Sequence, residues 1–197
     1  MTTRVTTELL KEVAASSTND GTSLSTGDSG KVVQLNAQGA IPSVYFAPIV
    51  DQWRLTSNLT GDASPITANL SRAAKLGGDV MTASSGIFTF PKTGFYKVEA
   101  VFQAAAAAAS GSCTASIEVS TNADAGSPTY TAVAQGLENG LPTVEYGSIM
   151  MSALVDVTAT ASVKVRFTVA QSNDSNALVG NASINYTHFT FTRIGDT

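Results

Sequence analysis

The stretch Ser85-Gly-Ile-Phe-Thr-Phe-Pro-Lys-Thr-Gly-Phe-Tyr-Lys-Val-Glu-Ala-Val-Phe102 predicts two β-strands joined by a tight turn. Phe88 and Phe90 are two residues apart and therefore share one face of an extended chain. Pro91 ends the ladder of the first strand because it has no N–H, and Gly94 permits a sharp reversal. Beyond the turn, every second residue is apolar and is expected to enter the core: Tyr96, Val98, Ala100 and Phe102.

Two further stretches show the same period of two, which a half-buried strand requires. Their apolar faces consist of Val163, Val165, Phe167 and Val169 in one stretch and of Ile149, Met151, Ala153 and Val155 in the other. The stretch Ser183–Ile194 is apolar at both parities, which predicts a long strand in the middle of a sheet with both faces covered. The run Ala104–Ala109 continues a predicted strand, and we expect it to end that strand rather than form a helix, because tertiary context overrides propensity.

Turn-forming residues separate the predicted strands. They gather at Gly77-Gly78, Ser127-Pro128, Glu138-Asn-Gly-Leu-Pro142 and Ser172–Asn176. Their spacing predicts about eight to ten short antiparallel strands. The expected fold is therefore an all-β jelly-roll sandwich rather than a sheet covered by helices.

Residues 1–50 differ in composition and pattern from residues 51–197, and they predict an extended N-terminal arm ahead of the β-domain. Thr2–Val13 has the cap and the apolar face of a short amphipathic helix. Ala14–Gly30 consists mostly of Ser, Thr, Asn, Asp and Gly, which is typical of a flexible linker. Lys31–Pro42 predicts a short strand followed by a glycine turn.

The composition excludes several classes of partner. Charged residues make up only 13% of the chain, the net charge is -4 and the isoelectric point is about 4.8. A nucleic-acid binder needs clustered Lys and Arg, so we expect no nucleic-acid partner. No apolar run approaches the roughly 18–20 residues of a membrane span, so we expect no membrane partner. The N-terminus lacks the basic-then-apolar layout of a secretion signal, which favours synthesis in the cytoplasm.

One cysteine and one histidine limit the chemistry that the chain can perform. Cys113 shares its strand parity with Ala115 and Ile117, so we expect a small buried hydrophobe rather than a reactive thiol. A single thiol and a single imidazole cannot build a zinc site within one chain, and the acidic residues form no calcium-loop pattern. We therefore expect neither a metal ion nor a cofactor.

The sequence contains parts of two catalytic patterns, a protease nucleophile motif and a set of carboxylates, and both are incomplete. Gly27-Asp-Ser-Gly30 matches the nucleophile motif of chymotrypsin-like proteases, but His188 lies far downstream, whereas the histidine of that family precedes its serine. A glycosidase needs two carboxylates that face each other, and Glu99, Glu118 and Glu145 occupy solvent-side positions of predicted strands. We therefore predict that the protein is not an enzyme and has no catalytic residues.

The motif at residues 85–102 resembles the signature of the complement C-one-q globular head, which is a tumour-necrosis-factor-like jelly-roll domain. The matching residues are Gly86, Phe88, Phe90, Pro91, Thr93, Gly94, Tyr96, Val98 and Phe102. Asp51–Thr56 is similar to the first strand of phage versions of this domain, and Phe189–Ile194 is similar to their closing strand. The resemblance implies a ten-stranded jelly roll that associates as a three-fold trimer about its inner sheet. It assigns these core or trimer contacts: Trp53, Phe88, Phe90, Tyr96, Phe102, Tyr186, His188, Phe189 and Phe191.

The stretch Gly30–Pro42 is similar to short repeats that precede globular tips in phage fibres and head-decoration proteins. The expected function is that of a bacteriophage structural protein of the virion, made in the host cytoplasm. In this hypothesis a homotrimer decorates or cements the capsid, and its arm binds the major capsid protein or another virion protein. The apolar anchors of the arm would be Leu9, Leu10, Val13, Val32, Val33, Leu35 and Ile41.

An alternative hypothesis keeps the fold and changes the role. The chain would then form the receptor-binding tip of a tail or head fibre, and would recognise a host surface receptor. Loops at Thr121–Thr129 and Gln135–Thr143 would carry the contacts.

Overall fold

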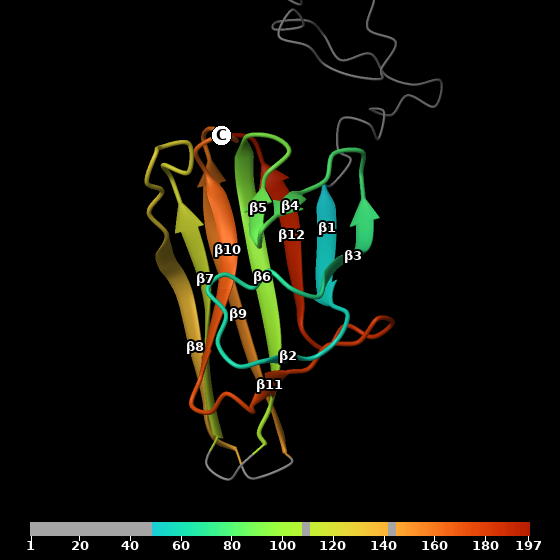
Figure 1. Cartoon of the computed structure of the whole chain (residues 1–197). Coiled ribbons are helices and arrows are strands. Elements are labelled where there is room, and N and C mark those ends of the chain that lie inside the picture. The colour runs from blue at the N-terminus through green and yellow to red at the C-terminus, as the bar shows by residue number, and fades with distance from the viewer. Residues whose placement is uncertain (1–48, 108–110, 142–144) are drawn as a thin grey trace, which may run out of the picture. The chain divides into compact units, whose positions relative to one another are not determined.

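A computed structural model describes residues 49–107, 111–141 and 145–197, which belong to one compact unit, Pro48–Thr197 (Figure 1). This part of the chain contains twelve β-strands, all pairs of which are antiparallel, and no helix. The strands form two sheets that pack face to face, so the predicted all-β jelly-roll sandwich is confirmed. The predicted arm, residues 1–50, lies almost entirely outside the described residues.

The larger sheet has seven strands arranged around the long strand β6. β6 pairs with β9 along one side and with β12 along the other, and β12 continues into β1 and then β3. The short strand β11 pairs with the end of β6, and β2 pairs with β11. The bounds of these strands are β1 Val50–Leu55, β2 Leu59–Thr60, β3 Leu70–Leu76, β6 Gly94–Ala105, β9 Tyr146–Val157, β11 Ala177–Leu178 and β12 His188–Gly195.

The smaller sheet has five strands in the order β4-β5-β10-β7-β8. Their bounds are β4 Thr82–Ser84, β5 Ile87–Thr89, β7 Gly111–Ser120, β8 Thr131–Leu141 and β10 Lys164–Gln171. The total of twelve exceeds the eight to ten strands expected, because β2, β4, β5 and β11 have only two or three residues each. Strands this short leave at most a faint period of two, and only β5 was predicted, from the motif that contains Phe88.

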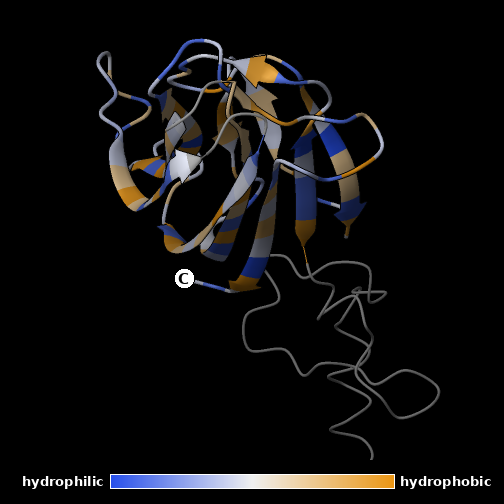
Figure 2. Cartoon of the chain, turned by 90° about the horizontal axis from the view of Figure 1, so that it is seen from below, coloured by the Kyte–Doolittle hydropathy of each residue, from blue (hydrophilic) through white to orange (hydrophobic). Residues whose placement is uncertain are grey.

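The predicted alternation is present in the long strands. In β6 the residues at 96, 98, 100 and 102 are buried, and in β10 the residues at 165, 167 and 169 are buried. Figure 2 looks at the sandwich from its lower end in Figure 1 and shows hydrophobic and hydrophilic residues alternating along the strands. Each sheet therefore turns one apolar face toward the other sheet.

Two sequence-based predictions about strand ends were wrong. The last strand does lie in the middle of its sheet, but it begins at His188 rather than Ser183. The side chain of Asn181 accepts hydrogen bonds from the backbone N–H groups of Ser183 and Ile184, and this local turn competes with sheet pairing. The stretch Glu138–Leu141, predicted as part of a turn, belongs instead to β8.

Pairing with β7 explains the second error. Cys113 pairs with Glu138 and Gly111 pairs with Leu141, so the ladder continues through the predicted turn residues. Gly140 has φ of 73°, a conformation that glycine adopts without strain, at a place where the register of the two strands shifts. The same ladder places residues 135–141 of the proposed receptor loop Gln135–Thr143 in a strand. Residues 142–144 lie outside the described residues.

Aromatic side chains fill the space between the sheets. Phe88 of β5 packs edge-on against Trp53 of β1, Phe167 of β10 and Phe189 of β12. The rings of Phe167 and Phe189 are stacked, with centroids 3.7 Å apart. Each fully buried aromatic side chain stabilises the fold by roughly 1.5–3 kcal/mol relative to exposure. The motif that predicted the fold thus supplies the centre of its core.

One edge of the sandwich is joined by a buried carboxylate. Asp51 of β1 has no exposed surface and accepts hydrogen bonds from Nε of Arg72 and from the backbone N–H of Met81, both at 2.9 Å. Arg72 of β3 also donates to the carbonyl of Met81, and its guanidinium lies over the ring of Trp53. Met81 directly precedes β4, so this cluster links both sheets at the β1–β3 edge.

At the opposite edge, a side chain of the larger sheet packs directly onto a glycine of the smaller sheet. A Cβ atom at Gly136 of β8 would clash with the side chain of Ile149 in β9, so only glycine fits there. The two edges of the sandwich are therefore closed differently. The Asp51–Arg72 ion pair closes one edge, and the packing of Ile149 onto Gly136 closes the other.

Cys113 lies on β7 and faces the core, as predicted. Burial raises the pKa of its thiol to about 11, with smaller contributions from the carboxylates of Glu138 and Asp62. The thiolate is the reactive form of cysteine. The side chain therefore behaves as a small hydrophobe at neutral pH.

Replacing the buried carboxylate should destabilise the fold strongly. Asp51→Ala leaves the Arg72 guanidinium without its anion and the Met81 N–H without an acceptor, and we expect a loss of about 3–5 kcal/mol in the free energy of unfolding. Asp79→Ala is the control, because Asp79 forms an exposed ion pair with Lys92 and should cost under about 1 kcal/mol. Urea unfolding curves measure both values. Equal losses in the two variants would contradict the role given to Asp51.

The native thiol should resist alkylation. With a pKa of about 11 for Cys113, almost no thiolate exists at pH 8, so iodoacetamide should modify the folded protein very slowly. Unfolding in urea at the same pH should allow complete modification, which intact-mass spectrometry measures. Rapid labelling of the folded protein would show that Cys113 is accessible.

Candidate functional site

The outer face of the seven-stranded sheet exposes several large apolar side chains. On β6, the residues between those in the core point outward, and they include Phe95, which is exposed. On the neighbouring strand β9, Tyr146, Met150 and Leu154 are 64%, 76% and 75% exposed. Their alternation places them on the same outer face. Because large exposed apolar patches mark interaction sites, these side chains make the outer face a candidate for one.

The apolar residues at the two edges of this sheet lie in one row across it. Leu76 of β3 pairs with Val50 of β1, and Val50 pairs with Thr192 of β12. The row continues through Lys97 of β6 to Leu154 of β9. Leu154 and the pair Val50–Leu76 therefore stand at the same height on opposite edges of the face.

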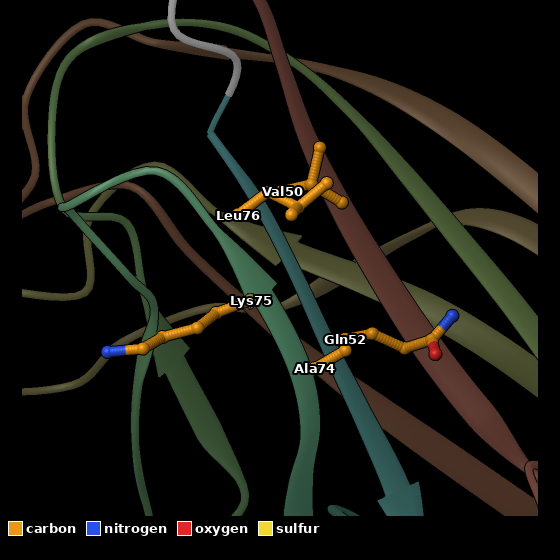
Figure 3. A pocket seen from close by; sticks show the side chains of 5 residues that line it. All are labelled: Val50, Gln52, Ala74, Lys75 and Leu76. Carbon is orange, nitrogen blue, oxygen red and sulfur yellow. The ribbon is translucent and has the colours of Figure 1, made fainter.

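A shallow groove of about 120 Å³ lies on this face between β1 and β3. Val50, Gln52, Ala74, Lys75 and Leu76 line it. Figure 3 shows the side chains of Val50 and Leu76 close together, whereas Lys75 points away to the other side of the strand. The groove is lined mainly by apolar atoms and is open to solvent.

A larger cleft of about 340 Å³ lies at the opposite end of the same face. It is lined by Gln103 of β6, Tyr146 of β9 and, from the segment between β11 and β12, Val179 and Tyr186. The backbone N–H of Val179 donates to the carbonyl of Gln103, at 2.8 Å, and holds that segment against β6. This hydrogen bond fixes the wall of the cleft that the segment between β11 and β12 forms.

Polar side chains occupy the middle of the face. Gln52 donates to the hydroxyl of Thr190 and accepts a hydrogen bond from Asn185, at 2.9 and 2.6 Å. Lys97 and Glu99 form an ion pair. Nδ1 of His188 is buried and, among the described residues, has no hydrogen-bond partner.

The predicted core or trimer residues divide between the core of the sandwich and the outer face of the seven-stranded sheet. Those that are fully buried in the sandwich are Phe88, Phe90, Tyr96, Phe102, Phe189 and Phe191. Trp53 packs against this core and is partly buried. His188 and Tyr186 belong to the outer face, where Tyr186 lines the cleft. The predicted arm anchors Leu9, Leu10, Val13, Val32, Val33, Leu35 and Ile41 lie outside the described residues.

The exposed apolar residues of β9 were not predicted to form a functional surface. Tyr146, Met150 and Leu154 share the parity that the alternation pattern assigns to solvent. Their four-residue spacing and apolar character were the available signal, because a strand that faces water on one side normally carries polar residues there.

The carboxylates considered for catalysis are not brought together. Glu99 lies on the outer face of the seven-stranded sheet, whereas Glu118 lies on the outer face of the five-stranded sheet, ion-paired with Arg166 at 2.7 Å. Arg166 in turn lies over the ring of Tyr130. In the part of the chain that the structure describes, no three His, Cys, Asp or Glu residues are grouped to hold a metal ion, and no helix could cross a membrane.

Comparison with known proteins identifies the fold. No family model and no curated protein sequence matches the chain. Among solved structures, Eiger TNF from S. frugiperda is similar over 77% of this chain and 95% of its own, with 13% identity and a TM-score of 0.55. Murine APRIL at pH 8.5 is similar over 75% of this chain and 99% of its own, with 10% identity and a TM-score of 0.54. The chain therefore has a tumour-necrosis-factor-like jelly-roll fold.

Proposed function

We propose that the protein is a non-enzymatic bacteriophage structural protein, a homotrimer that decorates or cements the capsid and is attached by its N-terminal arm. The observation that carries the self-association is the set of exposed apolar side chains on the outer face of the seven-stranded sheet. Met150 and Leu154 are each about three-quarters exposed there, and burying two such side chains contributes roughly 3–6 kcal/mol.

The arrangement of this face fits a cyclic assembly. Leu154 protrudes at one edge, and the Val50–Leu76 groove is hollow at the other edge, at the same height. Rotation about an axis parallel to the strands keeps that height, so the geometry allows Leu154 of one copy to enter the groove of the next. A contact between two different patches closes into a ring when the rotation allows it, and three copies give the proposed trimer.

In this proposal, the N-terminal arm attaches the trimer to the virion. The similarity of Gly30–Pro42 to repeats of phage fibres and head-decoration proteins supports a virion location. Three arms on one trimer bind with an effective concentration that raises the apparent affinity far above that of one arm. Weak apolar anchors such as Leu9, Leu10 and Val13 therefore suffice, with the major capsid protein or another virion protein as partner.

The cleft at Gln103, Tyr146 and Tyr186 favours the second candidate function, a receptor-binding fibre tip. It lies at the end of the domain away from the point where the chain enters at Val50, so an arm-anchored molecule can present it outward. Both functions require the trimer. They differ in what binds at the end of the domain that carries the cleft.

A charge at the protruding residue should dissociate the trimer. The wild-type protein should sediment at three times the 20.2 kDa of the chain. Leu154→Glu places a carboxylate in the proposed contact and should raise the dissociation constant roughly thirtyfold or more. The control is Leu137→Glu, which alters a residue 62% exposed on β8 of the other sheet and should leave sedimentation unchanged. A trimer that tolerates Leu154→Glu would exclude this contact.

Removing the arm should separate assembly from attachment. The deletion of residues 2–42 leaves the described domain intact, so we expect a folded trimer that no longer co-sediments with capsids of the phage. Leu9→Asp with Leu10→Asp in the full chain should weaken the same co-sedimentation. Retained capsid binding by the truncated trimer would refute the role of the arm.

A further inference from the structure

We propose that the cleft formed by Gln103, Tyr146, Val179 and Tyr186 binds a pyranose ring of a neutral saccharide. The cleft has a volume of about 340 Å³, which lies within the roughly 300–1,000 Å³ of small-molecule sites. This inference goes beyond the decoration role and holds for the domain whether or not the arm binds a capsid.

The lining has the chemistry that a sugar ring requires. Tyr146 and Tyr186 are 64% and 38% exposed, so parts of their rings are free to stack. The C–H faces of a pyranose pack on aromatic rings, and each phenol also carries a hydroxyl that donates and accepts hydrogen bonds. The Gln103 amide adds two N–H donors and one acceptor oxygen. Together these groups match a ring with apolar faces and hydroxyls at its edge.

The charge of the cleft selects against acidic sugars. Among the described residues, none of the four side chains that line the cleft carries a formal charge at neutral pH. Glu145 directly precedes Tyr146 and is exposed, so the nearest sequence neighbour is an anion. A carboxylated or phosphorylated ligand would find no cation among the lining residues. The ligand class is therefore a neutral hexose or N-acetylhexosamine.

The position of the cleft suits a ligand on another surface. The chain enters the domain at Val50, in the row that contains Lys97 of β6, and Tyr146 pairs with Ala105 of the same strand. Eight residues of strand separate these rows, a distance of roughly 26 Å. In Figure 1 the C-terminus is at the upper end of the sandwich, and β11, which precedes Val179, is at the lower end. The cleft thus lies at the end of the sandwich opposite to Val50, where the chain enters, and to the C-terminus.

Hydrogen bonds to β6 hold the wall of the cleft that carries Tyr186, so this wall is preformed. Val179 is tied to β6 by its backbone hydrogen bond to Gln103, and the hydroxyl of Thr187 accepts a hydrogen bond from the N–H of Gln103. Tyr186 lies between these two attachment points. A preformed wall lowers the entropy that binding costs.

Saturation-transfer NMR on the full-length protein tests the inference. The probes are the methyl glycosides of glucose, galactose, mannose and N-acetylglucosamine, with N-acetylneuraminic acid as the acidic probe. We expect saturation transfer to at least one neutral probe and none to the acidic one. Tyr186→Ala should weaken the apparent affinity about tenfold, the loss of about 1.4 kcal/mol that one stacked ring provides. Tyr186→Phe should keep most of the binding.

Ile184→Ala is the matched control, because Ile184 is half exposed on the same segment and does not line the cleft. Unchanged binding in Tyr186→Ala, or binding of the acidic probe alone, overturns the inference, as does the absence of transfer to all four neutral probes. Sedimentation of the same variants is measured in parallel. Loss of the trimer in Tyr186→Ala would assign the cleft to a subunit contact and overturn the sugar site, whereas a monomeric wild-type protein that binds sugar would overturn the trimer alone.

Discussion

The stacking of Phe167 on Phe189 joins the two sheets, and the rest of the structure depends on it. Phe167 belongs to the five-stranded sheet and Phe189 to the seven-stranded sheet, and their rings lie nearly parallel. Phe88 packs against both rings from β5. Because these side chains carry no polar atoms, they close the interior without requiring hydrogen-bond partners. The stacked rings therefore hold the sheets together through their inner faces, and the outer faces remain exposed.

The two edges of the sandwich are closed by different physical means, and this asymmetry shapes the surface. At β1–β3, the Asp51–Arg72 pair fills the edge with polar atoms that satisfy one another. At β8–β9, the strands approach so closely that Gly136 has no room for a side chain. The groove forms beside the first edge and the protruding Leu154 stands on the second. A surface with a hollow on one side and a projection on the other is suited to head-to-tail association rather than to two-fold pairing.

The outer face of the seven-stranded sheet combines two kinds of surface. The row that has Leu76 and Val50 at one end and Leu154 at the other lies near the chain entry, whereas the cleft with two tyrosines lies at the far end. Between them, Gln52 and Thr190 hydrogen-bond each other and give the face a polar centre. In the proposed trimer, whose axis is parallel to the strands, equivalent clefts lie at the same end of the assembly. Several weak sugar contacts at one end would then act together.

The sequence by itself determined the sandwich, because a period of two at residues such as Val98 and Val165 leaves only one face of each strand able to enter a core. It also placed Cys113 in that core. Tertiary structure alone decided where strands end and what the outer face offers. β8 runs through Glu138–Leu141 because its ladder with β7 supplies hydrogen bonds that outweigh local turn preference. Likewise, Tyr146 and Tyr186 are 40 residues apart in the sequence, and they line one cleft only because β6 holds β9 on one side and the segment before β12 on the other.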